Sequence, residues 1–289
     1  MPELLHHQRT FIGCLSVQRV PRPAPDAADS PAFDELAGRL WHRLPAAIAE
    51  DDILLVTQGF DAALTERCPA LGHDARCSVH GDRKPAICQV VPLDALRPDR
   101  VQHLVLAERQ AQAEHWGSDC IAPGLQPGFA VVTRRLSVVD GGARAALAER
   151  RRDLADERRF WGNAVFRMLH AELFSSSERL ARVPTGGFMT LSLAPVLMVL
   201  ADVSSRCRAR CIAYLDAQAE LIQRTLLGAR EQACTELDTI RQLNAFAGTN
   251  LRLRAMFASA PPAPARLPHS ERDALEHWLG LELDNSKGD

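Results

Sequence analysis

Cysteine residues are the side chains of this sequence with the clearest capacity for chemistry. Eight occur among 289 residues, and three of them fall in the segment 68–92, CPALGHDARCSVHGDRKPAICQVVP. Cys68, Cys77 and Cys88 are separated by eight and ten residues in a stretch rich in turn formers. Loops can direct several thiolates to one point, where zinc or an iron–sulfur cluster is held by sulfur ligands. The segment therefore predicts a metal site.

Several other kinds of site are absent from the sequence. There is no GxGxxG or P-loop motif, no G-x-S-x-G elbow and no C-x-x-x-C-x-x-C cluster loop. The 34 basic and 36 acidic side chains give a net charge of -2, which lacks the basic surplus that nucleic-acid binding needs. No apolar signal segment opens the chain, so we expect a cytoplasmic protein whose thiols bind metal rather than form disulfides.

The cysteine segment resembles the YkgJ-type cysteine-cluster family, whose members are described as zinc- or iron-chelating. That family reads roughly C-x-x-L, a short gap, then C-x-[IV]-[YH]-x-x-R-P-x-x-C and a proline. The residues that match it are Cys68, Leu71, Cys77, Val79, His80, Arg83, Pro85, Cys88 and Pro92. The segment is also similar to flagellin lysine-N-methylase-like proteins, whose methylase activity is linked to an iron–sulfur cluster. The resemblance covers the segment 68–92 firmly and the first 120 residues loosely.

Two departures from the family pattern concern the ligands. Lys84 stands between Arg83 and Pro85, one residue more than the pattern has. The family also opens with a C-x-x-C-x-x-C-C knot, where this chain has only Cys14, in TFIGCLSV. We therefore expect a single metal site and not a site with several metal ions.

The resemblance implies a fourth thiolate and a set of cofactors. The expected ligands are Cys14, Cys68, Cys77 and Cys88, with Cys120 as the alternative fourth ligand because the methylase-like proteins carry another cysteine downstream. The expected cofactor is an iron–sulfur cluster or zinc, and S-adenosylmethionine enters by the resemblance alone. A redox or protein-modifying activity on a protein substrate is the sharper form of this prediction, and the sequence names no catalytic residue for it.

Two other interpretations stay open at this point. In one, a structural zinc supports a helical docking or adaptor module that catalyses nothing. In the other, the cysteine site is vestigial and the activity lies in the helical part. Cys207 and Cys211, four residues apart in RCRARC, are expected to be buried.

The N-terminal part, residues 1–140, is expected to be a loop-rich cysteine-cluster region with minor β structure. Apolar spacing predicts a helix over 33–48 and another over 101–115. Runs of β-branched and aliphatic residues predict strands over 53–56 and 129–139, the second followed by a turn at 141–142.

The C-terminal part, residues 141–259, is expected to be all-helical, which makes the fold mainly α. Leu147, Leu154 and Trp161 lie along one face of a long helix, with solvated charges over 149–159 beside them. The apolar run 188–201 is shorter than the ~20 residues of a membrane span and predicts a buried helix. The remaining expectations are helices over 208–227 and 229–246, a linker over 260–268, and, within the terminal part 260–289, a capping box of Ser270 and Asp273 that starts a last helix through residue 283.

Overall fold

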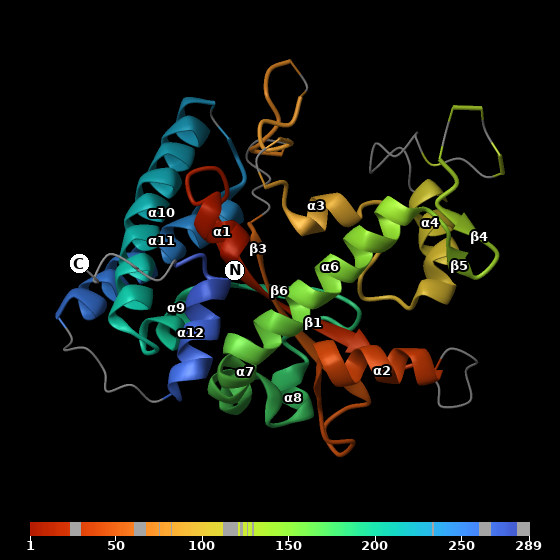
Figure 1. The fold of residues 1–289 in the computed structure, drawn as a ribbon. Coiled ribbons are helices and arrows are strands. Elements are labelled where there is room, and N and C mark those ends of the chain that lie inside the picture. Colours follow the sequence, from red (N-terminus) through yellow and green to blue (C-terminus); the bar gives the residue numbers. More distant parts are fainter. Residues whose placement is uncertain are drawn as a thin grey trace, which may run out of the picture.

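The computed structural model of this chain describes residues 1–23, 30–60, 68–74, 76–81, 83–111, 121, 124–125, 127–128, 130–232, 234–259 and 267–281. They form a mainly helical molecule around a small antiparallel sheet, which confirms the predicted fold class (Figure 1). Among these residues, no helix combines the length and the apolar character needed to cross a lipid bilayer.

The sheet contains four antiparallel strands in the order β2-β3-β1-β6. Their bounds are β1 (Gly13–Pro21), β2 (His42–Arg43), β3 (Asp51–Gly59) and β6 (Phe188–Ser192). In β3, Ile53 and Leu55 belong to one hydrophobic cluster, while Leu54 and Val56 belong to another. A strand that is covered on both faces has a nearly continuous apolar sequence, and the strand predicted over 53–56 is confirmed within β3.

Strand β6 occupies part of a segment that was predicted to be a helix. The single helix expected over 188–201 is wrong, because Phe188–Ser192 pairs with β1 and only Ala194–Ala201 forms a helix, α9. Pro195 lies in the first turn of α9, where its missing N–H leaves no hydrogen bond unmade. A short apolar run fits a buried strand as well as a buried helix, and pairing with β1 selects the strand. The C-terminal part is therefore not all-helical.

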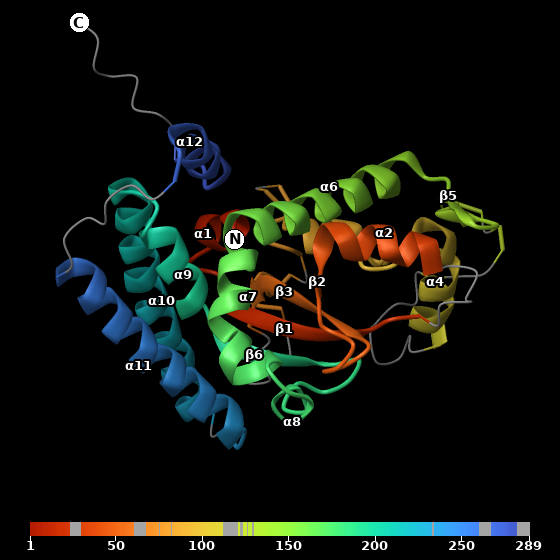
Figure 2. The same cartoon turned by 90° about the horizontal axis from the view of Figure 1, so that it is seen from below.

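Most of the remaining described chain is helical. Figure 2 shows α2 and α6 on one side of the sheet, and α9, α10 and α11 packed together at one end. The bounds are α1 (Pro2–His6), α2 (Ser30–Leu40), α3 (Ala86–Val90), η1 (Asp99–Val101), α4 (Gln102–Ala111), α6 (Gly141–Glu157), η2 (Arg158–Gly162), α7 (Asn163–Leu169), η3 (His170–Phe174), α8 (Ser177–Leu180), α10 (Ser205–Glu231), α11 (Leu237–Ser259) and α12 (His269–Trp278). The segments η2 and η3 are π-helical, so a nearly unbroken helix runs from α6 to η3.

Two N-terminal predictions needed correction. The helix expected over 33–48 ends at Leu40 and is followed by β2, since Pro45 cannot continue a helix. The strand expected over 129–139 is instead a short hairpin of β4 (Thr133–Arg134) and β5 (Ser137–Val138).

The turn expected at 141–142 is the first turn of α6. The side chain of Asp140 accepts a hydrogen bond of 2.7 Å from the Ala143 amide, which satisfies a free N–H at the start of the helix. At the other end of the chain, α12 begins at His269 without a side-chain cap, so the capping box expected at Ser270 does not form. Residues 112–115, 260–266 and 282–283 of the predicted helices and linker lie outside the described part of the chain.

The main hydrophobic core connects elements that are distant in sequence. Leu15 of β1, Trp161 of η2, Leu197 of α9, Tyr214 of α10 and Leu275 of α12 are almost fully buried and belong to one cluster. The sheet and this core therefore combine residues from both sides of position 140.

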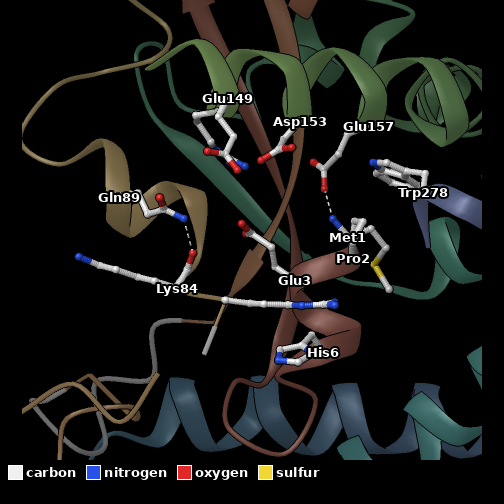
Figure 3. Close-up of a pocket in the computed structure, with 12 residues that line it drawn as sticks. Met1, Pro2, Glu3, His6, Lys84, Gln89, Glu149, Asp153, Glu157 and Trp278 are labelled. Carbon is white, nitrogen blue, oxygen red and sulfur yellow. Dashed lines mark hydrogen bonds and ion pairs between the residues drawn. The ribbon is translucent and has the colours of Figure 1, made fainter. Parts of the chain in front are cut away.

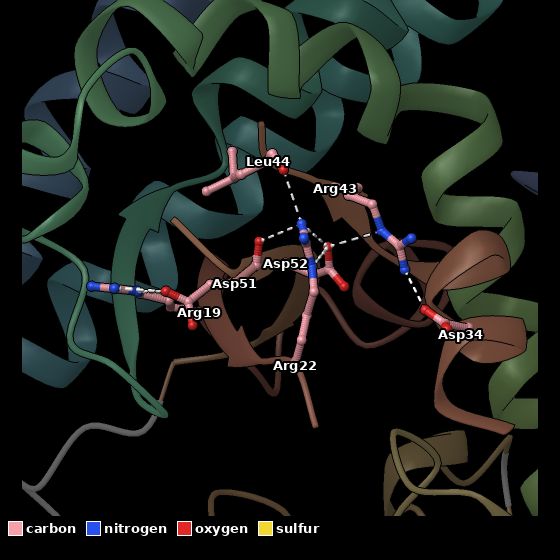
Figure 4. Close-up of polar contacts among 7 residues, drawn as sticks. All are labelled: Arg19, Arg22, Asp34, Arg43, Leu44, Asp51 and Asp52. Carbon is pink, nitrogen blue, oxygen red and sulfur yellow. Dashed lines mark hydrogen bonds and ion pairs between the residues drawn. The ribbon is translucent and has the colours of Figure 1, made fainter. Parts of the chain in front are cut away.

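A network of ion pairs connects the first three strands of the chain (Figure 4). Arg19 pairs with Asp51 at 2.6 Å and Arg22 pairs with Asp52 at 3.0 Å, which joins β1 and its extension to β3. Arg43 of β2 also approaches Asp52, at 3.7 Å. The Asp52 side chain is 1% exposed, so its charge depends on these arginines. We interpret the network as structural.

Candidate functional site

Cys68 and Cys77 lie in a tight loop that projects from the body between β3 and α3 (Figure 1). The amide of Leu71 donates a hydrogen bond of 2.9 Å to the Cys68 carbonyl, and Leu71 also forms an isolated antiparallel bridge with Cys77. A further bond of 2.7 Å runs from the Ser78 amide to the Ala70 carbonyl. These bonds place the two cysteines on adjacent arms of one loop.

Cys88 lies on α3, whose position is fixed by the N-terminal helix. The carboxylate of Glu3 in α1 accepts a hydrogen bond of 2.5 Å from the Ala86 amide at the start of α3. Nearby, the His7 Nε2–H donates to the Arg83 carbonyl at 3.0 Å. Because α3 also packs along α6, Cys88 is carried by a helix that is anchored from two sides.

The pKa of the Cys88 thiol depends on its burial and on the charges around it. Burial raises the pKa of the Cys88 thiol, and negative charge on Cys68 raises that pKa further. Lys84 lowers it, while Glu3 and Cys77 raise it. The fold therefore brings the three cysteines of the predicted motif into one electrostatic neighbourhood.

Cys14 is not part of this neighbourhood. It lies in β1 with 1% of its surface exposed, and burial raises the pKa of its thiol to about 12. Its neighbours are apolar side chains of α10 and α11, among them Ile222, Leu243 and Phe246. A thiol in such surroundings stays protonated, whereas a metal ligand must be a thiolate. The structure does not bring Cys14 to the other predicted ligands.

The fourth ligand and the geometry of the site stay predictions. Cys120, the alternative ligand, lies outside the described residues. Within the described part of the chain, no three side chains of His, Cys, Asp or Glu are already arranged to hold a metal ion. The thiols of Cys68, Cys77 and Cys88 are thus neighbours without being a preformed coordination site.

A cavity of about 610 Å³ lies beside the loop and α3. Its volume falls within the roughly 300–1,000 Å³ that is usual for small-molecule sites. Cys68 and Cys88 line it, so two of the three thiols face a space that could admit a ligand. The cavity wall is largely apolar, with contributions from Leu4, Phe11, Ile12, Phe60, Ile87 and Leu221.

A second cavity, of about 280 Å³, adjoins the first and is strongly charged. Glu149, Asp153 and Glu157 project from successive turns of α6 toward Glu3 on α1 (Figure 3). The two cavities share three lining residues: Met1, Glu3 and Arg150.

The carboxylates of the second cavity differ in how their charge is satisfied. Glu157 accepts hydrogen bonds from the amide of Thr57, at 3.1 Å, from the Thr57 hydroxyl and from the amino group of Met1. Asp153 has no such set of donors. Burial, followed by the charge of Glu3, raises the pKa of the Asp153 carboxyl to about 6.

Sequence reasoning missed this charged cavity, because residues 149–159 were expected to be solvated. The available signal was the four-residue spacing of Glu149, Asp153 and Glu157, which places like charges on one face of a helix. Like charges at that spacing repel, so their alignment indicates that neighbouring groups offset the repulsion.

No protein-family model, no curated protein and no solved structure matches this chain. The resemblance of segment 68–92 to the YkgJ-type family therefore stays a prediction that rests on its own residues.

Proposed function

We propose that this protein binds a thiophilic metal, as zinc or as an iron–sulfur cluster, through Cys68, Cys77 and Cys88. The observation that carries the proposal is that the fold places Cys68 and Cys88 on the wall of one cavity, with Cys77 bridged to Leu71 in the loop of Cys68. Burial, followed by negative charge on Cys68, raises the pKa of the Cys88 thiol, and a bound cation would act in the opposite direction by stabilising the thiolate. Cys14 is left out of the ligand set because it is sealed in the core.

Metal binding would have to draw the three thiolates closer together. Metal sites are rarely preformed, and the binding free energy supplies the free energy of ordering the ligands. The backbone hydrogen bonds described for the loop of Cys68 and Cys77 run within the loop itself. None of these described bonds has to break when the loop approaches α3.

The position of the thiols supports an accessible site over a closed structural one. Structural zinc sites are closed by four protein ligands, whereas sites that act on a substrate keep one position open. Cys68 and Cys88 are exposed and line the larger cavity. A metal bound there would offer Lewis-acid or electron-transfer chemistry to a substrate in that cavity.

The test is anaerobic purification of the full chain, followed by elemental analysis for zinc and iron and a visible spectrum on the same sample. We expect one metal site per chain in the unaltered protein and loss of the metal in Cys88→Ser and Cys77→Ser. Cys14→Ser is the matched control, since it also removes one thiol but should retain the metal. Colour with iron identifies a cluster, and colourless protein with stoichiometric zinc identifies a zinc site.

Two results would contradict the proposal. One is an unaltered protein that contains neither metal and takes up neither after anaerobic reconstitution. The other is metal content that is lost in Cys14→Ser and retained in Cys88→Ser. Circular dichroism on each variant separates loss of metal from loss of folding.

A further inference from the structure

Arg150 of α6 is a buried cation that lacks a hydrogen-bonding partner. The residue is 7% exposed, and its guanidinium donates no hydrogen bond and forms no ion pair to any residue that the structure describes. Its neighbour Arg151 shows the contrast, because that side chain binds the Ala95 carbonyl, the Arg97 carbonyl and the Asp99 carboxylate. None of its nitrogens is sealed from solvent, which reaches them through the cavities that Arg150 lines, so the charge is available to pair with a bound anion.

The side chain of Arg150 lines the apolar cavity, the charged cavity beside it and a third cavity of about 180 Å³. In the apolar cavity it is a full positive charge among aromatic and aliphatic side chains such as Phe11, Phe60 and Leu221. Ligand sites commonly combine an apolar wall with a few polar groups that fix the orientation of the ligand. The cavity has this composition, and a guanidinium is the group that pairs best with a carboxylate or phosphate.

The surrounding charges favour a ligand with a single negative charge. Glu3 lines the same cavity, and its carboxylate accepts the Ala86 amide rather than pairing with Arg150. The charge of Arg150 also acts on Asp153, one turn along α6. Glu149 and Glu157 also line the charged cavity with Arg150, so several carboxylates surround its charge. A dianion such as a phosphate monoester would therefore meet more repulsion than a monoanion.

We propose that the cavity beside Cys68 and Cys88 binds an amphipathic monocarboxylate. Its carboxylate pairs with Arg150, and its hydrocarbon body lies against Phe11, Phe60 and Leu221. This inference goes beyond metal binding and does not depend on it, because Arg150 lies on α6 and none of the three proposed ligands does.

The experiment is calorimetric titration of the full chain, below micelle-forming concentrations, with three ligands of equal chain length: dodecanoate, dodecanol and dodecyl phosphate. We expect saturable binding of dodecanoate, and weaker binding of the alcohol and of the phosphate. Arg150→Met keeps an unbranched apolar stem and removes the charged guanidinium. It should weaken dodecanoate binding at least about tenfold, as expected for loss of a charge-assisted pair, and leave dodecanol binding unchanged.

Two further variants make the result interpretable. Arg152→Met, on the exposed side of α6, is the matched control and should bind dodecanoate as the unaltered protein does. Ile87→Glu places a charge on the apolar wall at a residue that is 43% exposed, so it should fold and bind both dodecanoate and dodecanol more weakly.

The proposal is overturned if dodecanoate does not bind saturably, if dodecanol or dodecyl phosphate binds as tightly as dodecanoate, or if folded Arg150→Met binds dodecanoate unchanged. Chelator-treated protein should give the same result as untreated protein. Failure of the metal proposal therefore leaves this test intact, and failure of this test leaves the metal proposal intact.

Discussion

Polar groups have different surroundings in the main core and around the cavities. Strand β3 and the long helix that begins with α6 contribute residues to both regions. Among the buried groups, His42 and Cys211 are held neutral: burial lowers the pKa of His42 to about 4 and raises that of Cys211 to about 12. Around the cavities, Arg150 keeps an unpaired charge, and Cys68 and Cys88 remain exposed. Residue type alone therefore does not identify a functional site. Cysteines occur in both regions: Cys68 and Cys88 are exposed beside the cavity, whereas Cys207 and Cys211 are buried in the main core.

The largest expected difference between the two regions is in stability. Trp161→Ala removes a fully buried indole from the main core and should lower the free energy of unfolding by about 3–5 kcal/mol. Ile87→Ala, on the cavity wall, should change it by less than about 1 kcal/mol because that side chain is 43% exposed. Urea denaturation of both variants measures this. Equal losses would mean that the cavity region is part of the same packed core.

The pH dependence of stability should show the same contrast. The imidazole of His42 stacks on Phe166, and burial, with the charges of Arg158 and Arg167, lowers its pKa to about 4. The unfolded chain takes up this proton below about 6.5 and the folded protein only near 4. Stability is therefore lost as the pH falls through this window, by up to about 3 kcal/mol. His42→Phe keeps the stacking and should remove this loss.

Asp153 provides the control of opposite sign for that experiment. Its pKa is raised to about 6, so its carboxyl holds a proton in the folded protein more readily than in the unfolded chain. Its contribution to stability is present at low pH and is lost as the pH rises through 6. Asp153→Asn should thus steepen the loss of stability on acidification. Thermal unfolding between pH 4 and 7 tests both variants, and parallel curves for both and for the unaltered protein would refute the assignment.

The smallest effect on stability is expected from modification of the exposed thiols. In chelator-treated, folded protein, iodoacetamide should alkylate Cys68 and Cys88 and leave Cys14, Cys207 and Cys211 unmodified, because these three are buried. The melting temperature should barely change. Mass spectrometry of peptides identifies the modified residues. Early modification of Cys211 would show that the core is less sealed than its burial indicates.

The sequence predicted the fold best where the pattern is local. The face formed by Leu147, Leu154 and Trp161 and the strand over 53–56 needed only neighbouring residues to be recognised. The structure of 188–201 could not be predicted in this way, because β6 forms by pairing with β1, more than 160 residues earlier in the chain. Long-range pairing of this kind leaves no periodic signal in either segment.

The candidate site was predictable in part for a similar reason. The spacing of Cys68, Cys77 and Cys88 lies within one segment, and the structure places Cys68 and Cys88 on the wall of one cavity. Cys14 was included among the predicted ligands because of the resemblance. Whether it could be a ligand depended on the face of β1 that it occupies, and that face packs against α10 and α11. Arg150 was hidden in the charge-rich second half of α6, a stretch that the sequence predicted to be solvated. Only the packing of α1 and α3 on α6 shows that it is buried.

The long helix has a consequence for how the two walls of the apolar cavity open and close. Arg150 lies in a helix that continues through Trp161 into the main core, so its backbone amides should share the slow hydrogen exchange of the core. The opposite wall, with Cys68 and Cys88, consists of a loop and one short helix. A bound molecule would meet one wall that is already in place and a second that can adjust. The helix would then set the position of the charged end of that molecule, and the loop would set its rate of escape.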